Sequence, residues 1–110
     1  MAVKLIKQED GVSRKVDDAY SVLNLLTAED SNNVSVAVST AENCDKTTKT
    51  TSERAYYILE GELIADEEII AKKGDIIFIP ANTDYSFKGT FKAIIINSPP
   101  FRKGNETSTK

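Results

Sequence analysis

The chain has 110 residues and a formal net charge of -3, which is enough for one domain with a single hydrophobic core. Its 14 basic and 17 acidic residues are interspersed, so no cationic face is predicted for nucleic acid or for anionic membranes. No apolar run approaches the roughly 20 residues of a transmembrane helix, and residues 1–4 carry no signal-peptide pattern. We therefore expect a cytoplasmic protein whose partners include neither nucleic acid nor a membrane.

Histidine is absent from the chain, and Cys44 is its one cysteine. An internal disulfide and a multi-cysteine zinc site are therefore excluded. Without imidazole the chain has neither the usual general base near neutral pH nor the usual ligand for zinc, copper or iron. Any chemistry must use carboxylates, lysine, arginine, tyrosine or the lone thiol.

Residues 1–33 are expected to form N-terminal strands. Residues 3–6 predict a first strand at a sheet edge, and residues 8–11 (QEDG) predict a turn. Residues 19–26 fit helical spacing as well as a strand, and the β character of the rest of the chain favours the strand. The two strands are the expected edges for pairing with a second copy in a homodimer.

Residues 34–39 (VSVAVS) alternate between apolar and small side chains, as a strand does. We expect Val34, Val36 and Val38 to lie on one buried face. Residues 40–53 contain five threonines and no large apolar side chain. This composition predicts a loop at the rim of the domain or at the entrance to a site.

Short apolar runs closed by turn residues fill residues 54–87. The runs YYIL, LIA, IIA and IIFI end at Glu-Gly, an acidic triplet, Lys-Lys-Gly and proline, and none is long enough for a stable helix. Residues 91–96 predict a closing strand, and residues 102–110 predict a flexible tail. The nine or so strands predict a single all-β domain, either a double-sheet sandwich or a jelly roll.

The segments YYILEGE (residues 56–62) and GDIIFIP (residues 74–80) resemble the two sequence motifs of small single-domain cupins. The match, with its flanking strands, covers residues 34–101. It implies a double-stranded β-helix, the jelly-roll barrel of that family, over those residues.

The resemblance also implies where many cupins hold a metal, through three histidines and an acid, and each of these positions is changed here. They fall on Arg54 for the acid, on Thr48 and Thr50 (or Thr47 and Lys49 with the longer spacing) for the first two histidines, and on Tyr85 for the last. Glu53 is next to the acid position, but a shift of one residue turns a strand side chain to the other face. We therefore expect no metal and no other cofactor.

Arg54 is the most informative candidate residue. If it points into the barrel, its cation requires an anion or a buried acid as a partner; on the rim it would be an ordinary solvated arginine. Tyr56 shares its strand parity, and the hydroxyl groups of Tyr56 and Tyr85 would serve either a ligand or the backbone. The candidate ligand-binding residues are Thr48, Thr50, Arg54, Tyr56, Tyr85 and Phe87.

Three functions follow from this set. The first is a metal-independent cupin that binds a small polar or anionic molecule, as a sensor, carrier or accessory protein. The second is an enzyme of the isomerase, lyase or dehydratase type that uses tyrosine, arginine or carboxylate groups. The third is a metalloenzyme with oxygen ligands such as Asp45 and Glu53, whose strand parity does not suit the interior.

Overall fold

The computed structural model describes residues 3–101 and 106–109, and in these residues the fold is all-β. One turn of 3-10 helix, η1 (Gln8–Asp10), precedes the strands. The strands are β1 (Val12–Asp17), β2 (Tyr20–Leu26), β3 (Ser35–Thr50), β4 (Glu53–Ala65), β5 (Ile69–Lys72), β6 (Ile76–Ile79), β7 (Thr83–Ser98) and β8 (Glu106–Thr109). No helix in this described part of the chain is long and apolar enough to cross a membrane.

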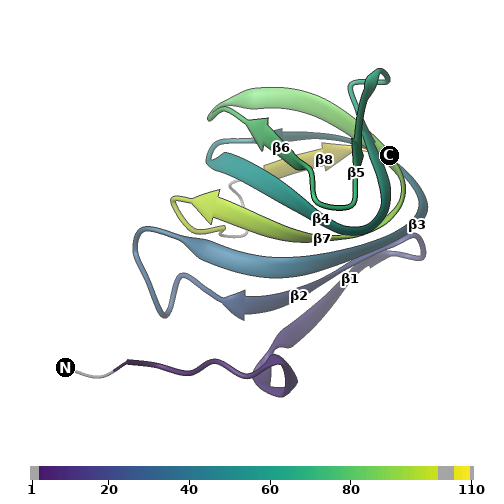
Figure 1. Ribbon diagram of the computed structural model, residues 1–110. Coiled ribbons are helices and arrows are strands. Elements are labelled where there is room, and N and C mark those ends of the chain that lie inside the picture. Colours follow the sequence, from purple (N-terminus) through teal and green to yellow (C-terminus); the bar gives the residue numbers. More distant parts are fainter. Residues whose placement is uncertain (1–2, 102–105, 110) are drawn as a thin grey trace.

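All strand pairs are antiparallel, and they form one sheet that folds over itself. The order is β1-β2-β3-β7-β4-β5, with β6 on β4 and β8 on β3. In Figure 1 the long strands β3, β4 and β7 curve around a common interior. Their halves therefore contribute to two facing layers: β1, β2 and β6 extend the first layer, and β5 and β8 extend the second. The predicted jelly roll is confirmed.

The three long strands bend where the backbone adopts positive φ. Asn43 in β3 (φ 51°), Gly61 in β4 (φ 76°) and Gly89 in β7 (φ 126°) mark the bends, and Gly89 pairs with both neighbouring strands there. A Cβ atom on Gly61 would lie 2.1 Å from the carbonyl oxygen of Thr90, and one on Gly89 would lie 2.4 Å from that of Glu62. Glycine is required because the strands approach one another too closely for any side chain.

Several boundaries differ from those expected. The strand predicted for residues 3–6 does not form: these residues pair with no strand among the described residues, and the first strand begins at Val12. The strand over residues 19–26 is confirmed as β2. It is paired on both sides, with β1 and β3, so it cannot act as the edge strand of a dimer.

The polar segment at residues 40–53 is strand rather than loop as far as Thr50. Threonine is β-branched and favours strands. Of the polar side chains on the inner face of this segment, Lys46 and Thr48 line the interior cavity described below. In the predicted tail, residues 106–109 form β8 against β3, while residues 102–105 and 110 lie outside the described residues.

The buried face of β3 is the opposite of the expected one. Ser35, Ala37 and Ser39 point inward and are 6%, 8% and 0% exposed, whereas the valines alternate with them on the outer face. Small inward side chains leave space for aromatic rings, which the pattern of apolar residues alone does not reveal. The expectation for Val34, Val36 and Val38 is therefore wrong.

Phe87 lies at the centre of an aromatic cluster that joins the two layers. Its ring centroid is 5.4 Å from that of Tyr20, 6.0 Å from Tyr56, 5.9 Å from Tyr85 and 6.2 Å from Phe91. Aromatic contacts of this kind are worth about 0.5–1.5 kcal/mol each beyond the area that they bury. The cluster fixes the distance between the layers and so the position of the polar groups beside it.

Two glycines with positive φ provide a matched test of the bend. Gly74→Ala places a Cβ atom in open space and should lower the free energy of unfolding by about 1–2 kcal/mol through φ strain alone. Gly61→Ala adds the backbone clash and should cost about 1–3 kcal/mol more. Urea denaturation of both variants measures this difference, and equal losses would contradict the close packing at the bend.

Candidate functional site

A hydrogen-bonded polar cluster lies inside the barrel. The Arg54 side chain is 5% exposed; its Nε donates to Asn97 Oδ1 at 2.6 Å and its Nη1 donates to Tyr85 Oη at 2.9 Å. The hydroxyl oxygens of Tyr85 and Tyr56 are 2.5 Å apart. An arginine thus fixes two phenols in a chain of hydrogen bonds, as buried polar groups require.

Strand register explains why these residues meet. Arg54 on β4 pairs with Asn97 on β7, so the two side chains emerge side by side on the inner face of the first layer. Tyr56 follows Arg54 on the same face, and Tyr85 comes from the second layer opposite. The cluster therefore spans the gap between the layers.

Tyr85 is held as a neutral phenol. Burial raises its pKa well above the ordinary value near 10, and the neighbouring Tyr56 adds to the increase, while the Arg54 guanidinium opposes it. A phenol with a raised pKa stays protonated at neutral pH and can donate a hydrogen bond, but it gives up its proton less readily than an ordinary tyrosine. Its main chemical capacity is to orient a neighbouring group or a ligand.

A cavity of about 80 Å³ lies beside the cluster, between the layers. Three cationic side chains line it, and none of its described lining residues is acidic. The lining includes Arg14, Asn24, Ser35, Lys46, Thr48, Arg54, Tyr56, Phe87, Asn97 and Phe101.

The structure brings most of the predicted residues together. Thr48, Arg54, Tyr56 and Phe87 line the cavity, and Tyr85 supports it through the hydroxyl contacts. Thr50 does not join them: its hydroxyl donates to the Ser52 carbonyl at 3.1 Å and accepts from the Ser52 amide at 3.1 Å, which closes the turn into β4.

Sequence reasoning missed Lys46, Arg14 and Asn97. Lys46 has the strand parity of Thr48, so the alternation would have placed it inward if residues 40–53 had been recognised as a strand. Arg14 lies on β1, which was not predicted, and its guanidinium stacks over the Phe101 ring at 5.2 Å. Asn97 lies one residue beyond the predicted closing strand (residues 91–96), whereas β7 continues through it to Ser98.

Cys44 is not suited to nucleophilic chemistry. It is 2% exposed, and burial raises the pKa of its thiol to about 11. The reactive thiolate is therefore scarce at neutral pH. This residue fills the core beside the bend of β3.

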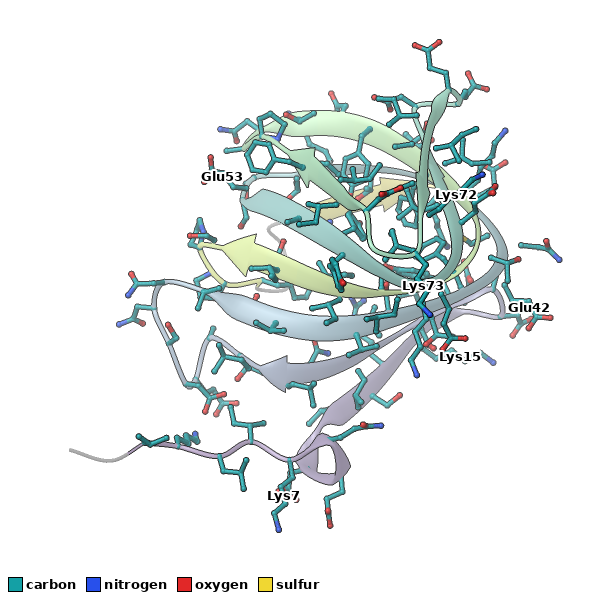
Figure 2. The ribbon with its side chains drawn as sticks, viewed as in Figure 1. Lys7, Lys15, Glu42, Glu53, Lys72 and Lys73 are labelled. Carbon is teal, nitrogen blue, oxygen red and sulfur yellow. The ribbon has the colours of Figure 1, made fainter. Side chains whose placement is uncertain are left out.

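The metal positions of the cupin pattern do not fit a metal ion here. The acid position holds the Arg54 guanidinium, which is itself a cation, and its neighbours are hydroxyl groups. Over the described residues there is no group of three or more His, Cys, Asp or Glu side chains that could hold one. Glu53 is exposed at the start of β4 (Figure 2), and Asp45 is exposed as well.

The sequence matches the family model of the ethanolamine utilisation protein EutQ over residues 1–99. The chain belongs to the EutQ family. With its fold, this makes it a small cupin domain. No curated protein matches this EutQ-family sequence.

Solved structures share the fold of this EutQ-family chain. Streptomyces Pac13 with uridine has a TM-score of 0.81 at 17% identity, covering 100% of this chain and 93% of its own. A EutQ protein of Salmonella typhimurium gives 0.69 at 23% identity, covering 74% and 71%. KdgF from Halomonas gives 0.77 at 11% identity, covering 94% and 99%. At these identities the similarity establishes the fold only.

Tyr85 generates a prediction for alkaline pH. Because its folded-state pKa is raised, its contribution to stability is fully present below about pH 10 and is lost as the pH rises further. Urea denaturation between pH 8 and 11.5 should show a less steep alkaline loss in Tyr85→Phe than in Tyr57→Phe, a control that removes an exposed tyrosine. Equal slopes would show that Tyr85 does not hold its proton more tightly in the folded state.

Proposed function

We propose that this EutQ-family protein binds a small anionic molecule inside its barrel without a metal, as a sensor, carrier or accessory protein. The observation that carries the proposal is the grouping of Arg14, Lys46 and Arg54 around one interior cavity. Cations in a confined site attract anions, and arginine matches a carboxylate or phosphate with two donors.

The polar cluster supports a defined orientation of that ligand. Arg54 is held by Asn97 and Tyr85, so its guanidinium has little freedom to lose when a ligand binds. Thr48 and Tyr56 add hydroxyl groups to the lining, and Phe87 adds an apolar wall. A small acid with one apolar side fits this combination.

A thermal-shift screen of small carboxylates, phosphates and uncharged analogues tests the proposal. Ligands of the folded state raise the melting temperature, and we expect anions to do so and neutral analogues not to. Arg54→Met should weaken binding of an identified anion by about tenfold or more, because it removes a charged hydrogen-bond donor. Lys49→Met, which removes an exposed cation from β3, is the control. A full response in Arg54→Met would contradict the proposal.

A second candidate is an enzyme of the isomerase, lyase or dehydratase type. The observation that favours it is the Arg54–Tyr85–Tyr56 chain, in which two phenols are hydrogen-bonded beside a guanidinium that can stabilise negative charge. Pac13, which shares the fold, is described as a nucleoside dehydratase. Under this alternative Tyr85→Phe loses turnover of a ligand that it still binds.

Metal independence, a cytoplasmic location and the absence of nucleic-acid partners remain part of the proposal. The hydroxyl and guanidinium groups at the cupin metal positions support the first. Elemental analysis of the purified protein is expected to find no stoichiometric transition metal. One iron or manganese ion for each chain would contradict it.

We also propose a homodimer, formed by the outer face of the first layer rather than by the predicted edge strands. Two in-register rows of apolar side chains cross this face, one from β2 to β6 and the other from β3 to β6, and we call them the outer apolar face. The rows are Leu23, Val38, Ile94, Tyr57 and Ile76, and Val36, Ile96, Ala55 and Phe78. Ile76 is 65% exposed and Phe78 is 59% exposed.

A second copy is the occupant that these features favour. A continuous apolar surface of this kind marks an interface, and a copy of the chain offers the same surface in return. The segment before η1 lies outside the barrel (Figure 1), where Lys4 forms an ion pair with Asp30 of the β2–β3 loop, and its Val3 and Leu5 are 90% and 76% exposed. Packed on a partner, these side chains would enlarge the interface toward the roughly 800 Å² for each partner that stable dimers bury.

Light scattering after size exclusion tests the dimer. The wild-type chain should elute at twice the 12.1 kDa of one copy. The double variant Ile76→Asp and Phe78→Asp should be monomeric, because it places charges within the outer apolar face. Ile70→Asp, a change to an exposed apolar residue of β5 outside that face, should stay dimeric. A wild-type monomer at micromolar concentration would contradict the proposal.

A further inference from the structure

Lys46, which lines the cavity, forms an ion pair with Asp17, and the two partners differ in burial. The Lys46 side chain extends inward from the second-layer half of β3 and is 8% exposed, whereas that of Asp17, at the end of β1, is 40% exposed. The Lys46 ammonium donates to Asp17 Oδ2. Asp17 thus places an oxoanion beside a cation of the ligand cavity.

The difference in burial decides which partner can be exchanged. A buried ammonium without an anion is costly, so Lys46 needs a negative partner at all times. A carboxylate that is 40% exposed regains hydration readily when it leaves. The other oxygen of Asp17, Oδ1, accepts from the Ala19 amide at 2.8 Å, so the β1–β2 turn retains an anchor when the ammonium is released.

The surroundings of Lys46 favour a second oxoanion. Arg14 and Arg54 line the same cavity, and no acidic side chain of the described residues does so. Arg54 donates to the neutral oxygens of Asn97 and Tyr85. A carboxylate or phosphate that enters this cavity has Arg14 and Arg54 in its lining besides Lys46, whereas the ion pair of Asp17 is with Lys46.

We propose that the oxoanion of the ligand displaces Asp17 from Lys46, so that Asp17 is a built-in competitor for the site. The inference rests on the proposed anion-binding function and deepens it: Lys46 binds the charged group directly, and the ligand class is small molecules with a carboxylate or phosphate. Uncharged analogues cannot replace Asp17 and are excluded. Until such a ligand binds, Asp17 remains the anionic partner of Lys46.

The test compares Asp17→Asn with Asp18→Asn. Asparagine keeps an oxygen for the Ala19 amide but removes the competing charge, so inorganic phosphate or acetate should bind at least about fivefold more tightly to Asp17→Asn than to the wild type. Asp18→Asn removes the same charge from a fully exposed side chain that contacts only Lys15 among the described residues, and it should bind as the wild type does. The two probes together show whether phosphate or carboxylate is preferred.

Binding is read from backbone amide signals in ¹H–¹⁵N NMR spectra during titration with each probe. In the wild type the Ala19 amide signal should move as the probe releases Asp17 from Lys46. Lys46→Met should abolish both this movement and the binding of the probe. If the affinity for the probe increases equally in Asp17→Asn and Asp18→Asn, the increase is due to net charge alone, and the inference is overturned. Unchanged or weaker binding in Asp17→Asn, or no binding of either probe to that variant, would overturn it too.

The proposed function fails by a different result. If both probes bind and Arg54→Met leaves their affinity unchanged, the interior cluster is not the site. If binding depends on Arg54 but is indifferent to Asp17 and Lys46, the proposed function stands and the exchange of Asp17 is wrong.

Discussion

The close approach of three bending strands is the constraint on which the structure depends. Because Gly61 and Gly89 allow backbone to pass against backbone, β3, β4 and β7 each contribute to both layers. A residue at the start of β4 can therefore reach one at the start of β7 across a closed interior. The contact between Arg54 and Tyr85 is a direct product of this folding over, and so is the pairing of Lys46 with Asp17.

The interior combines two environments that natural cores usually keep apart. On one side Phe87 packs against four other aromatic rings; on the other, cations and hydroxyl groups line the cavity. Buried charge contributes little to stability, since desolvation offsets most of the attraction. Polar groups concentrated in one part of a barrel are thus better explained by a ligand than by folding. By contrast, the charged residues labelled in Figure 2, such as Lys7 and Lys72, are exposed to solvent.

The sequence allowed the fold class to be predicted because short apolar runs ending at glycine or proline leave few alternatives to antiparallel strands. The bends could not be predicted, because a glycine after a short apolar run, such as Gly61, indicates a turn. Only the pairing with β7 on both sides of Gly61 shows that β4 continues through it. The family resemblance put Arg54 at a former metal-ligand position but left open whether it faces the interior or the rim, and the structure buries it. Lys46 and Arg14 were missed because a threonine-rich segment and a charged N-terminal strand both resemble loops when no pairing partner is known.

The central claim is that the barrel interior receives an oxoanion held by its own cations. The most direct measurement is a crystal structure of the protein with selenate, whose anomalous signal locates the ion without ambiguity. The account predicts a selenate between Lys46 and Arg54, within hydrogen-bonding distance of both, with Asp17 no longer bonded to Lys46. An interior without selenate, with the ion only on exposed lysines, would contradict it.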